Sequence, residues 1–282
     1  MSSILSNRVQ KVKPSATMAV SAKANELKAQ GVKVVPMGSG EPDFDTPSNI
    51  QKAAVDAIRG GQTRYTAVDG TTELKGAIRN KFKRDNELEY SANEVMASCG
   101  GKQVFYNLCQ AILNKGDEVI IPGPYWVSYP DMAILADANP MIIDTGLDQD
   151  FKITPEQLES SITKKSKLLV LNSPSNPTGA VYTREEIEEL GKVLERHPQV
   201  YIISDDIYEH ILLGDDAFVN IAMACPKLKD RIIILNGVSK AYAMTGWRIG
   251  YAAGPEDIIK AMKKIQGQST SNPTSIAQAA AV

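Results

Sequence analysis

The chain has 282 residues, and its 31 lysines and arginines against 33 aspartates and glutamates give a formal net charge of −2. This balance offers no basic surface for nucleic acid or for an anionic membrane. No stretch approaches about 18 consecutive apolar residues, which argues against a membrane span, and the polar N-terminal sequence lacks the apolar core of a signal peptide. Three cysteines without a CxxC pair and two histidines make a poor set of metal ligands. We therefore expect a cytoplasmic protein with reduced thiols and no metal.

The first part of the chain reads as helices joined by a turn-rich connector. The connector is GSGEPDFDTP, residues 38–47, in which glycine, proline and aspartate favour turns. Its two glycines, Gly38 and Gly40, flank a serine and would let the backbone approach a ligand closely, although a plain connector has the same composition. Apolar residues and helix-ending glycines predict helices over 16–29, 50–58 and 73–84.

From residue 94 the pattern changes to short β-rich runs that alternate with helices. Strands that are apolar throughout and separated by helices predict a mostly parallel sheet covered on both faces, which is an α/β fold. Two helices begin with capping-box signatures, at Thr154 and at Thr183. The predicted strands are 94–98, 118–122, 140–144, 167–172, 200–204, 231–235 and 247–253. The predicted helices are 102–114, 155–162, 184–195 and 256–265.

Residues that can do chemistry follow the first two of these strands. In such sheets, ligands bind outside the carboxyl ends of the strands. Cys99-Gly100-Gly101-Lys102 opens a helix, and its free N–H groups suit a phosphate, although a simple strand-to-helix turn explains it equally well. Gly123-Pro124-Tyr125-Trp126 presents two aromatic faces, for which core packing is the alternative.

Polar groups also follow two later strands. SPSNPTG, residues 173–179, has two X-Pro bonds and a glycine, a rigid loop that can hold the Asn176 amide in one orientation. Asp205 follows the next strand, and the phenol of Tyr208 comes three residues later. A surface turn explains one such acid, but it explains less well a set of strand ends that each offer a polar or aromatic group.

Lys240 lies just beyond the apolar strand 231–235, within NGVSKAYAMTGWRIGY, residues 236–251. Desolvation near the end of a buried strand disfavours the charged form of an amine. A neutral amine can attack a carbonyl and form a Schiff base. Arg248 follows eight residues later with a guanidinium. For these two residues alone, exposed loop charges are the simpler interpretation.

Taken together, these motifs resemble those of the fold type I pyridoxal-phosphate-dependent aminotransferases, and among them the class I, aspartate aminotransferase-like group. The resemblance covers nearly the whole chain and implies a large domain with a mostly parallel, mixed sheet between helices over 48–282. An N-terminal arm and a segment of a small domain would occupy 1–47. The motifs, in order, are GEPDFDTP, RYTAVDGTTELK, GGKQ, PYWVSYP, NSPSNPTGAVY, SDDIYEH and NGVSKAYAMTGWRIGY.

The resemblance implies pyridoxal 5′-phosphate as the cofactor and assigns residues to its ring. Lys240 matches the lysine that binds the cofactor as a Schiff base and later moves a proton. Asp205 matches the carboxylate under the pyridine nitrogen, which keeps that nitrogen protonated. Asn176 and Tyr208 match the pair that hydrogen-bonds the ring's phenolate oxygen. Trp126 matches the aromatic side chain stacked on the ring.

Further matches concern the phosphate, the substrate and a second subunit. The backbone amides of Gly101 and Lys102 and the guanidinium of Arg248 match the phosphate ligands. Tyr65 matches a tyrosine that reaches the phosphate of the neighbouring subunit, which implies a homodimer with shared active sites. The substrate side of the site is implied for Gly40, Trp126 and Asn176.

The activity implied is ping-pong transfer of an amino group between an L-amino acid, with aspartate or glutamate foremost, and a 2-oxo acid such as 2-oxoglutarate. Prephenate, aromatic and alanine substrates stay open, as does a lyase on the same scaffold. Family members continue beyond the position of Val282 with the rest of the small domain and an arginine for the substrate α-carboxylate. The non-catalytic alternative is therefore a shortened chain that binds the cofactor but does not transaminate.

Overall fold

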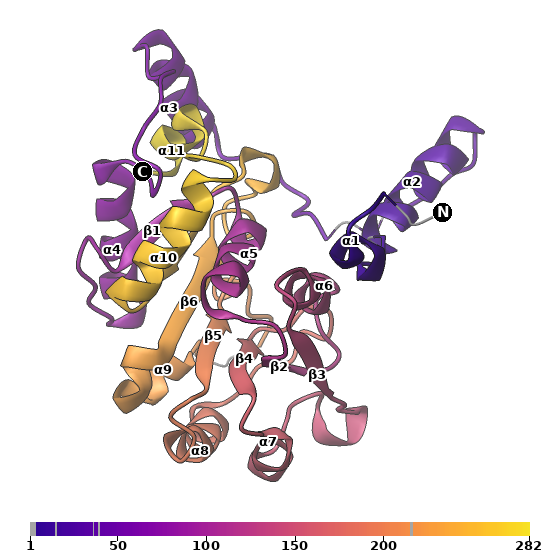
Figure 1. The fold of residues 1–282 in the computed structure, drawn as a ribbon. Helices are drawn as coiled ribbons and strands as arrows, with labels where there is room; N and C mark the ends of the chain where they lie inside the picture. Colours follow the sequence, from indigo (N-terminus) through magenta and orange to yellow (C-terminus); the bar gives the residue numbers. More distant parts are fainter. Residues whose placement is uncertain (1–3, 15, 36, 39, 215–216) are drawn as a thin grey trace.

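The computed structural model describes residues 4–14, 16–35, 37–38, 40–214 and 217–282. Its centre is a seven-stranded sheet with the order β1-β7-β6-β5-β4-β2-β3 (Figure 1). The strands are β1 (Val95–Ser98), β2 (Glu118–Pro122), β3 (Asn139–Ile143), β4 (Ser166–Asn172), β5 (Tyr201–Asp205), β6 (Ile232–Gly237) and β7 (Gly250–Ala253). Each predicted strand is confirmed, with bounds that shift by at most three residues.

The sheet is mostly parallel, with one reversed strand. The pairs β2–β3, β2–β4, β4–β5 and β5–β6 are parallel, whereas β7 is antiparallel to both β6 and β1. A parallel pair needs a long crossover, but an antiparallel pair can be joined by the shorter loop between β6 and β7. The predicted mixed, mostly parallel sheet is therefore confirmed.

Helices cover both faces of the sheet. One apolar cluster packs α5 (Gly101–Ile112), α6 (Ser128–Leu135) and α10 (Glu256–Gly267) against one face. The other cluster includes residues of α3, α4, α7, α8, α9 and α11. These helices are α3 (Ser48–Arg59), α4 (Thr72–Asn86), α7 (Pro155–Ser161), α8 (Arg184–Glu195), α9 (Ile221–Ala224) and α11 (Ser275–Ala281). Both predicted capping boxes are present, at Thr154 and Thr183, whereas α6 and α9 were not predicted.

The N-terminal part lies to one side of the sheet in Figure 1. It holds α1 (Asn7–Lys11), which was not predicted, and α2 (Ala16–Ala29), which was predicted with the same bounds. α1 contacts α6. The serine between Gly38 and Gly40 lies outside the described residues, and the division at residue 47 stays a prediction. Within the described part of the chain, no helix combines the length and apolarity needed to cross a membrane.

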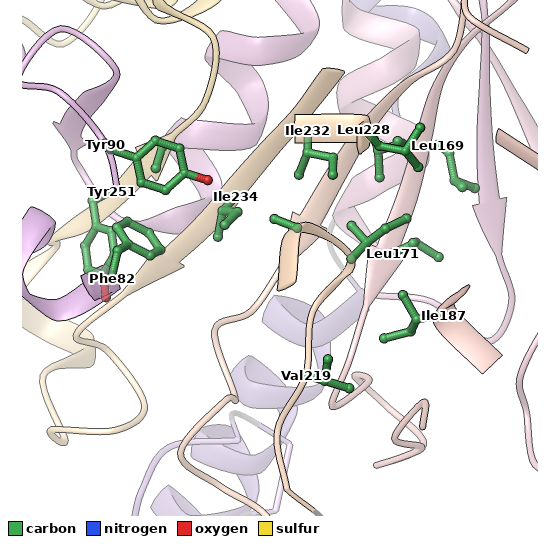
Figure 2. Packing of buried hydrophobic residues seen from close by; sticks show 14 of the residues in the cluster. Phe82, Tyr90, Leu169, Leu171, Ile187, Val219, Leu228, Ile232, Ile234 and Tyr251 are labelled. Atoms are coloured by element: carbon green, nitrogen blue, oxygen red, sulfur yellow. The ribbon is translucent and has the colours of Figure 1, made fainter. Parts of the chain in front are cut away.

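Aromatic edges fill the core beside the reversed strand. Phe82 on α4 meets the rings of Tyr90 and Tyr251 edge to face, with centroids 5.4 and 5.8 Å apart (Figure 2). Phe82 is fully buried, so its removal leaves a cavity that these rings cannot fill. We expect Phe82→Ala to lower the free energy of unfolding by about 3–5 kcal/mol in urea denaturation. Phe44→Ala, at a phenylalanine that is 82% exposed, should cost less than about 0.5 kcal/mol; equal losses would contradict this packing.

Candidate active site

The carboxyl ends of three neighbouring strands lie in register. Asn172 of β4 is opposite Asp205 of β5, and Asp205 is opposite Leu235 of β6. A cavity of about 630 Å³ opens over this edge. Nine of the predicted site residues line it: Gly40, Gly101, Lys102, Trp126, Asn176, Asp205, Tyr208, Lys240 and Arg248. Tyr65 is not among them and is 93% exposed on the loop between α3 and α4.

One end of the cavity is positively charged. Gly100, with φ +85°, precedes α5, and a Cβ there would lie 2.1 Å from the guanidinium of Arg248. Only glycine therefore lets Arg248 lie against the first turn of the helix. Its guanidinium donates hydrogen bonds to the carbonyls of Thr245 and Cys99, at 2.8 and 3.3 Å. These bonds fix a cation beside the N–H groups that a helix cannot use itself.

The backbone at the start of α5 also packs closely against β7. A Cβ at Gly250 would lie 2.3 Å from the amide nitrogen of Gly101. The ammonium of Lys102 lies 5.1 Å from the ring centre of Trp126. Burial, and then the charge of Arg248, lower the pKa of Lys102. Two neighbouring positive charges, Lys102 and Arg248, together with free helix N–H groups, form a place suited to a phosphate dianion.

Asp205 is a buried carboxylate that lines the cavity. Its side chain accepts hydrogen bonds from the Tyr129 hydroxyl at 2.5 Å and from the Ile207 amide at 3.3 Å. Burial raises its pKa to about 6, even though these two hydrogen bonds favour the charged form. A protonated ring nitrogen next to Asp205 would supply a positive charge that stabilises the ionised carboxylate.

Tyr208 and Asn176 stand together on the next loops. The Asn176 side-chain amide donates to the Tyr208 hydroxyl at 3.5 Å, and the Asn176 backbone amide donates to the side chain of Asn172 at 2.8 Å. Burial raises the pKa of Tyr208, so the phenol is neutral and can donate. Both side chains therefore present donors to the same part of the cavity.

Lys240 reaches the cavity from the loop after β6. Its ammonium donates to the carbonyl of Gly40 at 2.8 Å and lies 5.9 Å from the ring centre of Tyr208. Burial lowers the pKa of Lys240, Glu41 raises it, and Arg248 lowers it further, with a net decrease. The amine thus loses its proton more readily than an exposed lysine, as a nucleophile or base must.

Residues 40–46 are hydrogen-bonded to Lys240 and to the loop that follows it. The Thr245 hydroxyl donates to Glu41 at 2.8 Å, and the Thr46 hydroxyl donates to the Ala243 carbonyl at 2.6 Å. The Trp247 indole donates to the Thr46 hydroxyl at 3.0 Å. No role was predicted for these side chains, because nothing in the sequence shows that two segments about 200 residues apart are in contact.

Tyr129 was also missed as a site residue. It lies in the quoted motif PYWVSYP, three residues after Trp126, and its ring meets Trp126 edge to face at 5.2 Å. Its hydroxyl points to Asp205 because α6, which was not predicted, begins at Ser128. The available signal was a second aromatic residue three positions after Trp126 in the same motif.

Comparison with known proteins identifies the family. A family model for aminotransferase class I and II matches residues 32–282, and the chain belongs to this family of transaminases. It is 60% identical over 277 residues to an aspartate/prephenate aminotransferase of Nitrosomonas europaea, covering 98% of this chain and 70% of that protein. It is 58% identical over 278 residues to one of Cereibacter sphaeroides, covering 99% and 70%.

Solved structures agree. The aspartate aminotransferase of Rhizobium meliloti superposes with a TM-score of 0.94 at 48% identity, covering 98% of this chain and 69% of that one. The aspartate aminotransferase of Thermus thermophilus with maleate gives 0.94 at 47% identity, covering 98% and 71%. The fold type I architecture expected from the sequence motifs is thereby confirmed.

Proposed function

We propose that the protein uses pyridoxal 5′-phosphate to move an amino group between an L-amino acid and a 2-oxo acid. The observation that carries this proposal is the grouping of nine separately predicted residues around one cavity. A cationic helix terminus at one end, a buried carboxylate at the base and an amine of lowered pKa match the phosphate, ring nitrogen and carbonyl of that cofactor.

Each group has a place in this proposal. The N–H groups of Gly101 and Lys102 and the guanidinium of Arg248 would hold the phosphate, and Trp126 would cover one face of the ring. Asp205 would pair with the ring nitrogen, and Tyr208 and Asn176 would orient the ring oxygen. When bound, pyridoxal phosphate supplies a ring that stabilises negative charge at the substrate α-carbon.

The proton movements fall to Lys240. Its amine would hold the cofactor, and its Nζ would carry the proton away from the substrate α-carbon. The lowered pKa of Lys240 suits this role, because a base with a pKa nearer neutrality has a larger unprotonated fraction.

Aspartate and glutamate with 2-oxoglutarate are the proposed substrates, with prephenate as a further amino acceptor. The support is the name aspartate/prephenate aminotransferase carried by relatives at 58–60% identity. Gly40, Trp126 and Asn176, the residues predicted for the substrate, all line the cavity.

We also propose a homodimer in the cytoplasm. The predicted role of Tyr65 at the neighbouring phosphate fits a side chain that is almost fully exposed in the single chain. Unpaired cysteines at positions 99, 109 and 225 fit a reducing compartment.

The test is a substrate panel. The purified protein with pyridoxal phosphate should transaminate aspartate or glutamate with 2-oxoglutarate, and glutamate or aspartate with prephenate. Turnover should require the 2-oxo acid acceptor. Turnover without an acceptor would indicate a lyase instead, and cofactor binding without any transamination would contradict the proposed function.

The role of Arg248 gives a separate prediction. Arg248→Ala removes a bidentate, charge-assisted contact, and we expect an affinity for pyridoxal phosphate about 10- to 100-fold weaker. Titration of the cofactor-free protein by absorbance measures it. Arg184→Ala, at an exposed position of α8, should leave the affinity unchanged. An unchanged affinity in Arg248→Ala would remove Arg248 from the phosphate site.

A further inference from the structure

A buried hydrogen bond behind the cavity joins its two reactive segments. Tyr208 lines the cavity, but the next residue, Glu209, is only 5% exposed and is not among the lining residues. The Glu209 carboxylate accepts a hydrogen bond at 2.8 Å from the side-chain amide of Asn236. Asn236 belongs to β6, four residues before Lys240. The bond therefore ties the turn that carries Asp205 and Tyr208 to the strand that leads to Lys240.

Glu209 is held in place from its other side as well. The ammonium of Lys81 on α4 forms an ion pair with it, and the side-chain amide of Asn86 donates to it at 3.1 Å. Burial alone would raise the pKa of Glu209, but a hydrogen bond from His210 and the charge of Lys81 lower it to about 2. Glu209 is therefore ionised and fully bonded.

The same neighbourhood contains three potential metal ligands, Asp85, Glu209 and His210. Lys81 already supplies the positive charge there, since its ammonium pairs with Glu209 and lies 4.0 Å from Asp85. The cluster therefore acts as an ion-pair anchor for the turn.

Asn236 is fixed equally firmly. It is 2% exposed, and its side-chain oxygen accepts a hydrogen bond from the Gly237 amide at 2.7 Å. Its amide group thus has a donor and an acceptor in use, which sets its orientation. One backbone bond reinforces the link, from the Asp206 amide to the Leu235 carbonyl at 2.8 Å.

We propose that Glu209 and Asn236 are positioning residues, whose buried hydrogen bond sets the placement of the Tyr208 phenol relative to the Lys240 amine. The inference rests on the proposed aminotransferase function. Neither side chain lines the cavity, so neither touches substrate or cofactor. Misplacement of reacting groups by about 1 Å can cost about 100-fold in rate, so such an anchor affects the chemical step.

The first test is Asn236→Ala, which removes the neutral partner and leaves Glu209 its other donors. We expect kcat to fall about 10- to 100-fold, with little change in KM for the amino donor, because the groups that bind it stay in place. Ser166→Ala is the control. Ser166 is equally buried, and its hydroxyl accepts a hydrogen bond from the Thr163 amide at 2.9 Å. It is the first residue of β4 and so lies at the opposite end of the strands from the cavity. It should lose stability while kcat per folded molecule is retained.

A second pair of variants separates positioning from folding. Glu209→Gln keeps an oxygen that can accept from Asn236, whereas Glu209→Ala does not. We expect Glu209→Gln to retain more of kcat than Glu209→Ala. Combining Glu209→Ala with Asn236→Ala should lower kcat no further than the more damaging single substitution, because both substitutions remove the same hydrogen bond.

A readout on the cofactor-free protein makes the inference independent of turnover. The rate at which acetic anhydride modifies Lys240, measured by peptide mass spectrometry against the exposed Lys115, should change several-fold in Asn236→Ala and stay constant in Ser166→Ala. If the wild-type protein does not transaminate but this rate changes, the proposed function fails and the positioning role stands. An unchanged Lys240 rate, or an unchanged kcat in an active enzyme, would overturn the positioning role.

Discussion

Replacing Lys240 by alanine should lower the rate of transamination by at least about 10⁴-fold, because one amine serves both as covalent ligand and as base. The structure gives it a position that no other described lysine shares, with Nζ bonded to the Gly40 carbonyl and beside the Tyr208 ring. Steady-state rates of the purified variants with aspartate and 2-oxoglutarate measure the effect.

Two companions sharpen this result. Lys240→Arg keeps a positive charge but cannot bind a carbonyl covalently, so it should be equally inactive. Lys115→Ala, on an exposed turn, should retain the wild-type rate. Measurable turnover in Lys240→Ala above about one hundredth of the wild-type rate would show that another group does the chemistry.

Asp205→Asn should have the second largest effect, a fall in kcat of about 10²- to 10³-fold. Asparagine keeps the shape of Asp205 and can still accept from Tyr129, but it cannot balance the charge of a protonated ring nitrogen. The carboxylate is buried at the base of the cavity, and water cannot replace it there. A rate within threefold of the wild type would remove Asp205 from its proposed role.

The same substitution predicts a pH effect on the cofactor-free protein. Burial raises the pKa of Asp205 from 3.8 to about 6, so the folded state binds the proton more tightly than the unfolded state. The contribution of Asp205 to stability is fully present below pH 4 and is lost as the pH rises through about 6. Between pH 4 and pH 7 the free energy of unfolding of Asp205→Asn should therefore rise by about 3 kcal/mol relative to that of the wild type, as measured by urea unfolding. A variant whose stability falls relative to the wild type over this pH range would contradict the burial argument.

Local patterns predicted most of the fold. The bounds of α8 were predicted without error, because Thr183 and Glu186 form a capping box that marks its first turn. The strand from Ile232 is apolar on both faces, as a strand between two helical layers must be. By contrast α6, over Ser128–Leu135, was missed, because its short sequence is apolar without a marked helical period.

The grouping of the predicted cofactor residues around one cavity could be predicted because they follow strand ends that lie in register. Asn172, Asp205 and Leu235 are aligned across three strands, which brings together loops far apart in sequence. The bond between Glu209 and Asn236 was not predictable, because it depends on which way each side chain turns. The predicted role of Tyr65 depends on a second subunit and stays a prediction.

The most direct measurement of the central claim is to trap the cofactor on the protein. The wild-type protein would be mixed with pyridoxal phosphate, reduced with borohydride, digested and mapped by mass spectrometry. We expect one modified peptide, with the label on Lys240, and no such label in Lys240→Arg. A label on Lys102 or another lysine, with Lys240 unmodified, would contradict the assignment of this cavity.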